Sequence, residues 1–415
     1  MKKLTLDEWE AKNIVGQVKR FDQKFFISNR FSWDHELMET SKDATHIGFG
    51  KIRPKPGYSI DELALHWASR RGTVLELLNN SKPNPTGVVT AVDAAIRSSN
   101  PRLQPVDFKP PQGVKADTSD PKRLSRNLKK VARYFGADLV GICRLDRRWV
   151  YSSTYEGEGT YHAGDSGTKA GTSTPLEVPP EFQYAIVMCF EEEYSMLKFF
   201  PSYIDNAAAS MGYSRMAFSN LCLSNYVRNL GFQAIDCTTN GVAMNVPIAI
   251  QAGLGELGRN GLLITPEFGP RVRISKVLTD MPLDADTPIE FGVTDFCNVC
   301  KKCAVVCPSQ AIHAGERTPE PRTVSNSDGV LKWPVNPETC RRYWARMSKS
   351  CTVCIASCPY NKPSTYFHRF VRWCTDHMRW ANPLFVKLDD LLGYGKPQNP
   401  ANFWEEWQPK RHVKS

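Results

Sequence analysis

The chain has 415 residues and a formal net charge of +10, from 53 Lys and Arg against 43 Asp and Glu. Hydrophobic residues make up 41% and charged residues 23%, which is ordinary for a soluble globular protein and excludes wholesale disorder or a collagen-like repeat. The length predicts two or three domains, and the modest, dispersed basic excess is weak evidence for nucleic-acid binding.

The N-terminal region, residues 1–118, is predicted to be mixed in character. A helix is expected over 6–20 and a second over 59–78, where Ser59 is a typical helix cap. Loops rich in Pro, Asn and Ser follow, and residues 101–120 read as a connector. The first residues, MKKLTLDEWEAK, lack an apolar core, so no signal peptide or twin-arginine leader is visible. We expect either a cytoplasmic protein or a chain from which a leader is missing.

Helices and short apolar strands alternate over residues 119–290. Helices are predicted at 121–136, 204–231 and 246–258, strands at 137–146, 181–190, 232–237 and 270–280, and a loop rich in Gly, Ser and Thr at 152–180. This alternation indicates an α/β or α+β core. A cysteine-rich domain is expected at 291–362. The C-terminal segment, 363–415, carries four tryptophans and is expected to pack on the body of the protein.

Eight of the thirteen cysteines fall into two compact motifs. The first motif is Cys297-x2-Cys300-x2-Cys303-x3-Cys307 followed by Pro308, and the second is Cys340, ten residues, then Cys351-x2-Cys354-x3-Cys358 followed by Pro359. Zinc favours isolated CxxC pairs, and disulfide frameworks are typical of short secreted chains, so neither explains this spacing. It is the signature of bacterial ferredoxins, and two motifs predict two [4Fe–4S] clusters.

In such ferredoxins the last cysteine of each motif binds the cluster of the other motif. We therefore predict two sets of ligands. The first cysteine set is Cys297, Cys300, Cys303 and Cys358, and the second cysteine set is Cys307, Cys340, Cys351 and Cys354. The insert at 341–350 is expected to form a helix or loop at a cluster edge. The five scattered cysteines are expected to be small buried hydrophobic residues.

The stretch 253–261, GLGELGRNG, contains the GxGxxG pattern of dinucleotide-binding loops. The pattern follows a helix-like run rather than a strand, and the acidic residue expected after a second strand is missing, so it is weak evidence for NAD. A tight turn is the simpler interpretation. A third is a backbone surface that lets a large planar cofactor approach closely.

Three segments resemble the corrinoid-dependent reductive dehalogenases: 211–235 (MGYSRMAFSNLCLSNYVRNLGFQAI), 240–258 (NGVAMNVPIAIQAGLGELG) and 253–283, which leads into the cysteine motifs. The resemblance is strong over roughly 120–365 and weak before that. It implies an α+β protein, with a nitroreductase-like α/β core that binds a base-off corrinoid and a C-terminal ferredoxin-like domain with two [4Fe–4S] clusters. It also implies an organohalide substrate, a low-potential electron donor and a membrane anchor protein at the outer face of the cytoplasmic membrane, with a homodimer possible and no nucleic acid.

The same resemblance implies roles for particular residues. Tyr213 is the expected proton donor, Asn240 its polar partner and Arg273 the catalytic cation. Arg271 competes for that last role, and Arg259 in the glycine stretch is a third candidate. Contacts with the cofactor are expected from Gly255, Arg259, Asn260, Pro266, Phe268 and Arg271. A tyrosine beside a guanidinium suits proton donation because the cation stabilises the phenolate that is left. Without the resemblance, Tyr213 would read as a helix residue packed under the strands.

Two other functions remain open from the sequence. Epoxyqueuosine reductases also pair a corrinoid with two cubane clusters, but act on tRNA and commonly carry helical repeats after the clusters. A polyferredoxin electron carrier would need the clusters alone, without the large body that precedes them. The aromatic residues Phe31, Trp33, Trp67, Trp333 and Trp344 are candidates for an apolar substrate site, although each is also a candidate core residue.

Overall fold

The computed structural model describes residues 1–42, 52–53, 55–73, 115–158, 169–239, 241–363 and 365–408. Its centre is a four-stranded sheet in the order β2-β5-β9-β6. The strands are β2 (Leu139–Arg144), β5 (Tyr184–Glu191), β9 (Val272–Thr279) and β6 (Ala234–Cys237). Every neighbouring pair is antiparallel, which makes the core α+β rather than a parallel α/β sheet.

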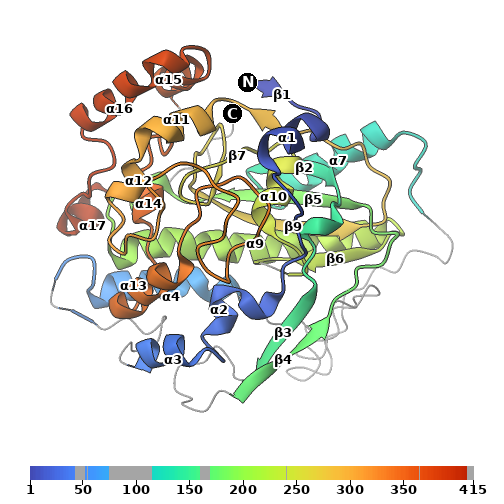
Figure 1. The fold of residues 1–415 in the computed structure, drawn as a ribbon, viewed down its shortest axis with the longest axis horizontal. Coiled ribbons are helices and arrows are strands. Elements are labelled where there is room, and N and C mark those ends of the chain that lie inside the picture. Colours follow the sequence, from blue (N-terminus) through green and yellow to red (C-terminus); the bar gives the residue numbers. More distant parts are fainter. Residues whose placement is uncertain are drawn as a thin grey trace.

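Helices cover both faces of this sheet, as Figure 1 shows. The long helix α9 (Tyr203–Asn229) packs with α7 (Pro121–Tyr134) against one face, around Ile142, Ile186 and Met188. Helix α10 (Asn245–Gln251) packs on the other face, around Cys143, Val187 and Cys189. Side chains of successive strand residues point to opposite faces, so the apolar residues 185–190 of β5 are buried on both sides of the sheet.

Helix α9 has clear sequence signals at both ends. Ser202 and Asp205 form a capping box at its start, and Gly231 follows its end with a φ of 87°. Small residues on the helix, Ala207 to Ala209 and Gly212, let neighbouring elements approach closely. The prediction of a helix over 204–231 is therefore confirmed within two residues.

The N-terminal region wraps around the core. Its elements are β1 (Lys2–Lys3), α1 (Leu6–Asn13), η1 (Gln23–Phe25), α2 (Ile27–Arg30), α3 (His35–Lys42), α4 (Ile60–Arg70) and η2 (Arg71–Thr73). Strand β1 pairs with β10 (Ile289–Glu290), and α4 packs along α9, where His66 contacts Ser210. The predicted first helix is shorter than expected, because its cap falls at Ile14, just before Gly16 with a φ of 100°.

The remaining short elements of the core are η3 (Arg147–Trp149), α8 (Tyr194–Leu197), β7 (Glu256–Leu257) and β8 (Leu263–Ile264). The helix predicted over 246–258 ends at Gln251, and Gly253 with a φ of 73° turns the chain into β7. The loop predicted over 152–180 is wrong in part, because β3 (Ser153–Glu158) and β4 (Lys169–Pro175) form a hairpin there. Its Thr and Tyr residues favour strands, and the abundant Gly and Ser hid that signal.

The C-terminal half of the chain is built from short helices. They are α11 (Val293–Cys300), α12 (Lys302–Val305), α13 (Pro337–Met347), α14 (Val353–Ala356), α15 (Tyr366–His377), η4 (Arg379–Ala381), α16 (Asn382–Leu391), η5 (Pro400–Asn402) and α17 (Phe403–Glu406). The insert between the cysteines of the second motif is helical, as α13. Asp389 of α16 pairs with Lys302 and Lys362, and Phe403 is fully buried against Phe199. Among the described residues, no helix has both the length and the apolar character to cross a bilayer.

The core meets the cysteine-rich region at a turn that only glycine tolerates. Gly269 has a φ of 58°, and a Cβ added there would lie 2.3 Å from the carbonyl oxygen of Tyr360. We predict that Gly269→Ala lowers the free energy of unfolding by about 2 kcal/mol or more, through strain and this clash. Gly393→Ala is the matched control, since Gly393 has a φ of 73° and open space around it. Equal losses in urea unfolding of the two variants would contradict the prediction.

Candidate active site

Tyr213 and Arg273, predicted from separate segments, lie in contact. Tyr213 is half-buried on α9, and Arg273 is the second residue of β9. The guanidinium carbon of Arg273 lies 4.6 Å from the centroid of the Tyr213 ring, within the range of a cation–π interaction. The sheet packs on α9 at this point, so the contact follows from the fold of the core.

A buried carboxylate lies behind the arginine. Glu192, fully buried at the end of β5, places its Oε1 2.6 Å from Nε of Arg273, whose side chain is 22% exposed. The two atoms are at ion-pair distance, but the angle is too poor for a hydrogen bond, and among described residues neither carboxyl oxygen of Glu192 has one. Burial raises the pKa of the Glu192 carboxyl, and the guanidinium opposes that rise. Burial alone would lower the pKa of Arg273, but the nearby carboxylate of Glu192 outweighs this effect and raises the pKa of Arg273. The pair is a guanidinium that faces a carboxylate.

Arg271 has quite different surroundings. It precedes β9, its side chain is 1% exposed, and its guanidinium is held by protein groups on several sides. It donates to Oε1 of Glu191 (3.0 and 3.1 Å), the carbonyls of Phe268 (3.0 Å) and Lys362 (2.8 Å), and Oδ1 of Asn361 (3.3 Å). Arg271 thus joins the core to the end of the cysteine-rich region. Arg273 is therefore the arginine that lies beside Tyr213.

Asn240, the third predicted catalytic residue, lies outside the described residues. The segments on either side of it are tied to β9 by a polar network. Asn245 donates from Nδ2 to the carbonyl of Ile274 (3.0 Å), and Nζ of Lys276 donates to its Oδ1 (2.5 Å). Lys276 is fully buried, and this burial lowers its pKa to about 8. Sequence reasoning missed both Lys276 and Glu192; the run of three acids at 191–193 after an apolar strand was the available signal.

The first cysteine set surrounds a small cavity of about 20 Å³. All four members, Cys297, Cys300, Cys303 and Cys358, line it together with Arg259, Asn260 and Tyr360. Cys358 comes from the second sequence motif, so the structure brings residues of both motifs to one place. Arg259 is 1% exposed, and its Nη2 is a buried donor without a hydrogen-bond partner among the described groups.

The second cysteine set also gathers from both motifs. Cys307 packs in one cluster with Cys340 and Cys354, and Cys354 interacts electrostatically with Cys351, Cys340 and Cys307. Burial and the neighbouring thiols raise the pKa of Cys340 to about 12. Within the described residues no three acidic, His or Cys side chains converge closely enough for one metal ion. A cubane spreads its four thiolates over four irons, and supplies the positive charge that buried thiolates need.

The loop that carries Cys351 is anchored on the first turn of α9. Asp205 accepts a hydrogen bond from Oγ1 of Thr352, and Oγ of Ser350 donates to Oδ1 of Asn206 at 2.5 Å. Asn206 in turn donates to the carbonyl of Ser350 at 3.1 Å. One rigid helix therefore carries both Tyr213 and the groups that hold the second cysteine set.

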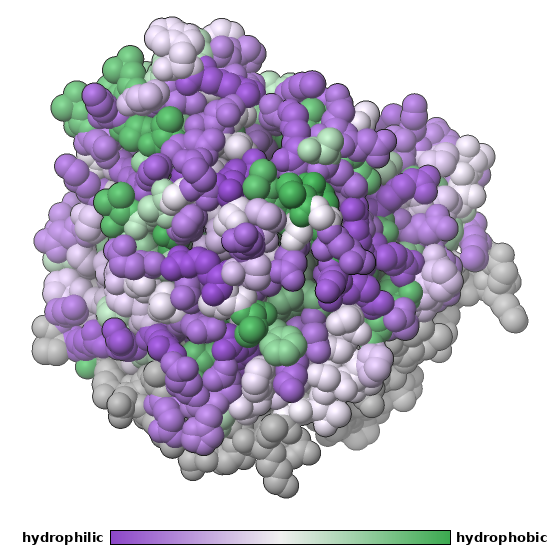
Figure 2. Space-filling model, in the orientation of Figure 1, coloured by the Kyte–Doolittle hydropathy of each residue, from purple (hydrophilic) through white to green (hydrophobic). Residues whose placement is uncertain are grey.

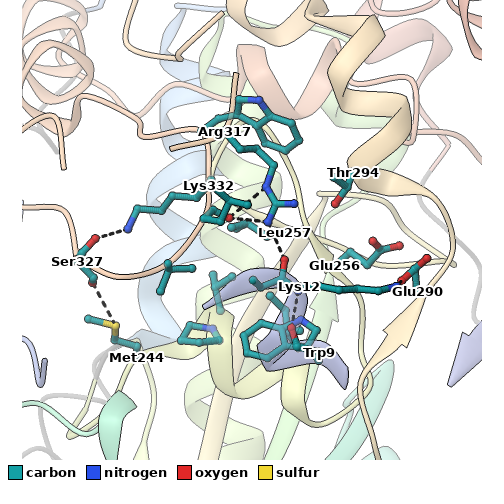
Figure 3. Close-up of a pocket in the computed structure, with 18 of the residues that line it drawn as sticks. Trp9, Lys12, Met244, Glu256, Leu257, Glu290, Thr294, Arg317, Ser327 and Lys332 are labelled. Atoms are coloured by element: carbon teal, nitrogen blue, oxygen red, sulfur yellow. Dashed lines mark hydrogen bonds and ion pairs between the residues drawn. The ribbon is translucent and has the colours of Figure 1, made fainter. Parts of the chain in front are cut away.

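A cavity of about 550 Å³ opens beside α10. Figure 3 shows Trp9 and Met244 on one wall, Arg317 and Lys332 on another, and Glu256 at the side. Trp149 and Trp333 also line it, and their buried indole N–H groups have no partner among the described groups. Burial raises the pKa of Glu256 to about 7. The cavity is mainly apolar, with donors ready for polar groups of a ligand.

The residues predicted to contact a cofactor lie in three places. Gly255 faces the carbonyl oxygen of Ile264, where an added Cβ would approach to 2.1 Å, so close backbone packing accounts for this glycine. Arg259 and Asn260 lie at the first cysteine set. Pro266 and Phe268 lie in the turn between Thr265 and Gly269, where Phe268 packs on the core and under the guanidinium of Arg271. Of the glycine stretch, Gly261 lines the large cavity.

Residues 296–362 match the family described as a 4Fe-4S dicluster domain. The protein is thus an α+β protein that carries a dicluster segment of the ferredoxin kind. The chain is 39% identical over 314 residues to a tetrachloroethene reductive dehalogenase of Sulfurospirillum multivorans, covering 72% of this chain and 62% of that one. A solved reductive dehalogenase, titled as suggesting a mechanism for B12-dependent dehalogenation, shares the fold over 95% of this chain and 49% of its own, with a TM-score of 0.70 and 24% identity.

The chain is therefore similar in sequence to reductive dehalogenases, the family that its sequence motifs resemble. An epoxyqueuosine reductase of Lactococcus garvieae is more distant, with 28% identity over 177 residues, or 42% of this chain and 47% of that one. The chain spans 62% of the length of the Sulfurospirillum relative.

The network around Arg271 generates a prediction about stability. Arg271→Met keeps much of the volume but leaves the Glu191 carboxylate and several carbonyls short of a donor. We expect the free energy of unfolding to fall by about 3–5 kcal/mol, the usual cost of removing one partner from a buried ion pair. Arg123→Met is the control, because Arg123 pairs with Asp117 at the surface and such pairs contribute about 1 kcal/mol or less. Urea unfolding followed by circular dichroism measures both; similar midpoints would refute the anchoring role.

Proposed function

We propose that the chain is the catalytic part of a reductive dehalogenase, which replaces a halogen of an organohalide with hydrogen. The contact between Tyr213 and Arg273 carries this proposal, because it places a guanidinium, with its carbon 4.6 Å from the ring centroid, beside a group that can donate a proton. The reaction R–X + 2e⁻ + H⁺ → R–H + X⁻ needs one proton and two electrons. The similarity to reductive dehalogenases supports the assignment.

We propose that the two cysteine sets each bind a [4Fe–4S] cluster. Each set draws its fourth cysteine from the other sequence motif, as the crossover in ferredoxins requires. Arg259 has a free buried donor beside the first set, and a hydrogen bond from it to a cluster sulfur would raise the potential of that cluster. The clusters would pass electrons one at a time towards the core.

We further propose that the cavity beside α10 receives part of a corrinoid. The buried donors of Trp149 and Trp333 fit the amide side chains of such a group, and Gly261 leaves room at the wall. The residues proposed as its neighbours are Gly255, Arg259, Asn260, Pro266, Phe268 and Arg271. Of these, Arg271 and Gly255 would act indirectly, by fixing the conformation of the turns in which they lie. When bound, a corrinoid supplies the low-potential cobalt that cleaves the carbon–halogen bond.

The residues of the chain then handle the proton. The Tyr213 hydroxyl donates to the carbon that loses the halogen, and the phenolate left behind is stabilised by the Arg273 guanidinium. Asn240 is proposed to bind the hydroxyl or the substrate from the loop after β6. Water or another acid would reprotonate Tyr213 between turnovers.

A low-potential electron donor and a membrane anchor protein are the proposed partners, with the outer face of the cytoplasmic membrane as the proposed location and a cytoplasmic protein as the alternative. Apolar side chains gather over α15 and α16 (Figure 2), where Tyr366, Trp380 and Leu391 are about four-fifths exposed. Such a patch is unusual on a monomer and supports a partner surface there. A homodimer remains possible, and no nucleic-acid partner is proposed.

The exchange of cysteines can be tested by two matched variants. The holoprotein should contain about eight iron atoms per chain, four for each cubane. We expect Cys307→Ala to damage the cluster of the second cysteine set and Cys358→Ala that of the first, because each removes a ligand supplied by the other motif. Electron paramagnetic resonance of the reduced variants would identify the lost signal. If Cys307→Ala instead removed the signal that Cys297→Ala removes, the assignment would be wrong.

The proton donor can be tested with a change of one oxygen atom. Tyr213→Phe keeps the ring, and so should keep folding, iron and corrinoid content, while turnover falls by about 10²-fold or more. Tyr226→Phe, thirteen residues further along α9, is the control and should retain its activity. Arg273→Lys should also lose activity, since an ammonium does not reproduce the planar fork. Rates of halide release by preparations matched for iron and cobalt decide; full activity of Tyr213→Phe would exclude it as donor.

A further inference from the structure

Glu192 has no part in the mechanism described above, although it lies directly behind the proposed site. It is fully buried at the end of β5, where the neighbouring Glu191 serves Arg271. Its Oε1 lies 2.6 Å from Nε of Arg273, and no hydrogen bond to either carboxyl oxygen is made within the described part of the chain. A buried carboxylate without hydrogen bonds is costly, so an interaction with one cation is its main compensation.

The opposite side of Arg273 is shaped by α9. A Cβ added at Gly212 would lie 2.8 Å from Cγ of Arg273 and 3.8 Å from Cγ of Glu192. The arginine stem therefore passes between the helix and Glu192 through a gap that only glycine leaves. The next residue of the helix, Tyr213, receives the guanidinium on its ring. The position and direction of the Arg273 side chain are thus fixed by the carboxylate of Glu192, by the lack of a side chain at Gly212 and by the ring of Tyr213.

We propose that Glu192 is a positioning residue: it holds Arg273 against Tyr213 and balances the guanidinium charge next to the second cysteine set. The inference deepens the proposed function and rests on it. The charge balance has a consequence of its own, because Arg273 and the second cysteine set both pack against α9, Arg273 at Gly212 and the loop of Cys351 at Asp205. An unbalanced positive charge at that place would favour the reduced form of a nearby cluster.

Glu192→Gln removes the charge and keeps the shape, and Glu193→Gln is the matched control. Glu193 lies next in sequence and caps α8 through Ser195. We expect Glu192→Gln to lower kcat about 10-fold or more, as loss of an outer partner of a reactive centre commonly does. We also expect a less negative midpoint potential for the cluster of the second cysteine set, measured by redox titration with electron paramagnetic resonance. Glu193→Gln should change neither quantity.

A double-mutant cycle separates positioning from general structural support. In an Arg273→Gln background, Glu192→Gln should no longer shift the potential, because the buried Glu192 carboxyl is neutral once its guanidinium partner is removed, and glutamine then changes no charge. Glu192→Gln alone could fail to fold because it leaves a charge unpaired. In that case the double variant, which leaves no unpaired charge, and Gly212→Ala still test whether Glu192 positions Arg273. Gly212→Ala should lower kcat by displacing Arg273, although alanine favours the helix.

Unchanged kcat and potential in Glu192→Gln, or the same shift in the Arg273→Gln background, would overturn the inference. Failure of the proposed function looks different: wild-type protein with full iron and corrinoid would then release no halide from any organohalide tested. The comparison of potentials would still decide the role of Glu192 in that case.

Discussion

The burial of two arginines at the start of β9 is the constraint on which the site depends. A guanidinium is always charged at neutral pH, so each buried one requires a partner charge or a full set of acceptors. Antiparallel pairing of β5 with β9 sets Phe190 opposite Arg273 and Glu191 opposite Val272, and so brings the acids at the end of β5 to these arginines. Arg271 uses Glu191 and three further acceptors, which leaves it wholly occupied with structure. Arg273 has Glu192 and the Tyr213 ring.

The long helix α9 fixes the distance between the second cysteine set and the proposed proton donor. Asp205 and Asn206 hold the loop of Cys351, and Tyr213 follows Asp205 by eight residues, or about 12 Å along a helix. The second cysteine set and the proposed proton donor therefore move as one body. Electron delivery and proton delivery both need tight positioning, and a single capped helix provides it for both.

Much of the candidate site was predictable from the sequence because its signals are local. Cysteine spacing identifies an iron–sulfur segment without any structure, and the cap and closing glycine of α9 mark that helix within two residues. Arg271 and Arg273 are two residues apart, so the alternation of side chains along a strand could not separate them in the sequence. The structure does, because Arg271 stands outside the strand and its acceptors come from residues up to 91 positions away. Glu192 was missed because a carboxylate after an apolar strand looks like a surface residue in the sequence. Only the packing of the sheet and the helix shows that it is buried. The hairpin at 153–175 was missed because Gly and Ser masked its alternation.

The arrangement of the two cysteine sets also gives the proposed electron path a direction. The first set packs beside α16, where Cys297, Cys300 and Cys358 share a core with Phe385 and Val386, and Asp389 ties that helix to Lys302 and Lys362. The second set lies at α9, and its Cys354 packs in one cluster with Cys303 of the first set. The apolar face of α15 and α16 is thus on the side of the first set (Figures 1 and 2), and the proposed proton donor Tyr213 is on the side of the second. Under the proposed function, a donor bound at the tail would reduce the first cluster, and the electrons would arrive at the end of the molecule where Glu192 has already balanced the charge of Arg273.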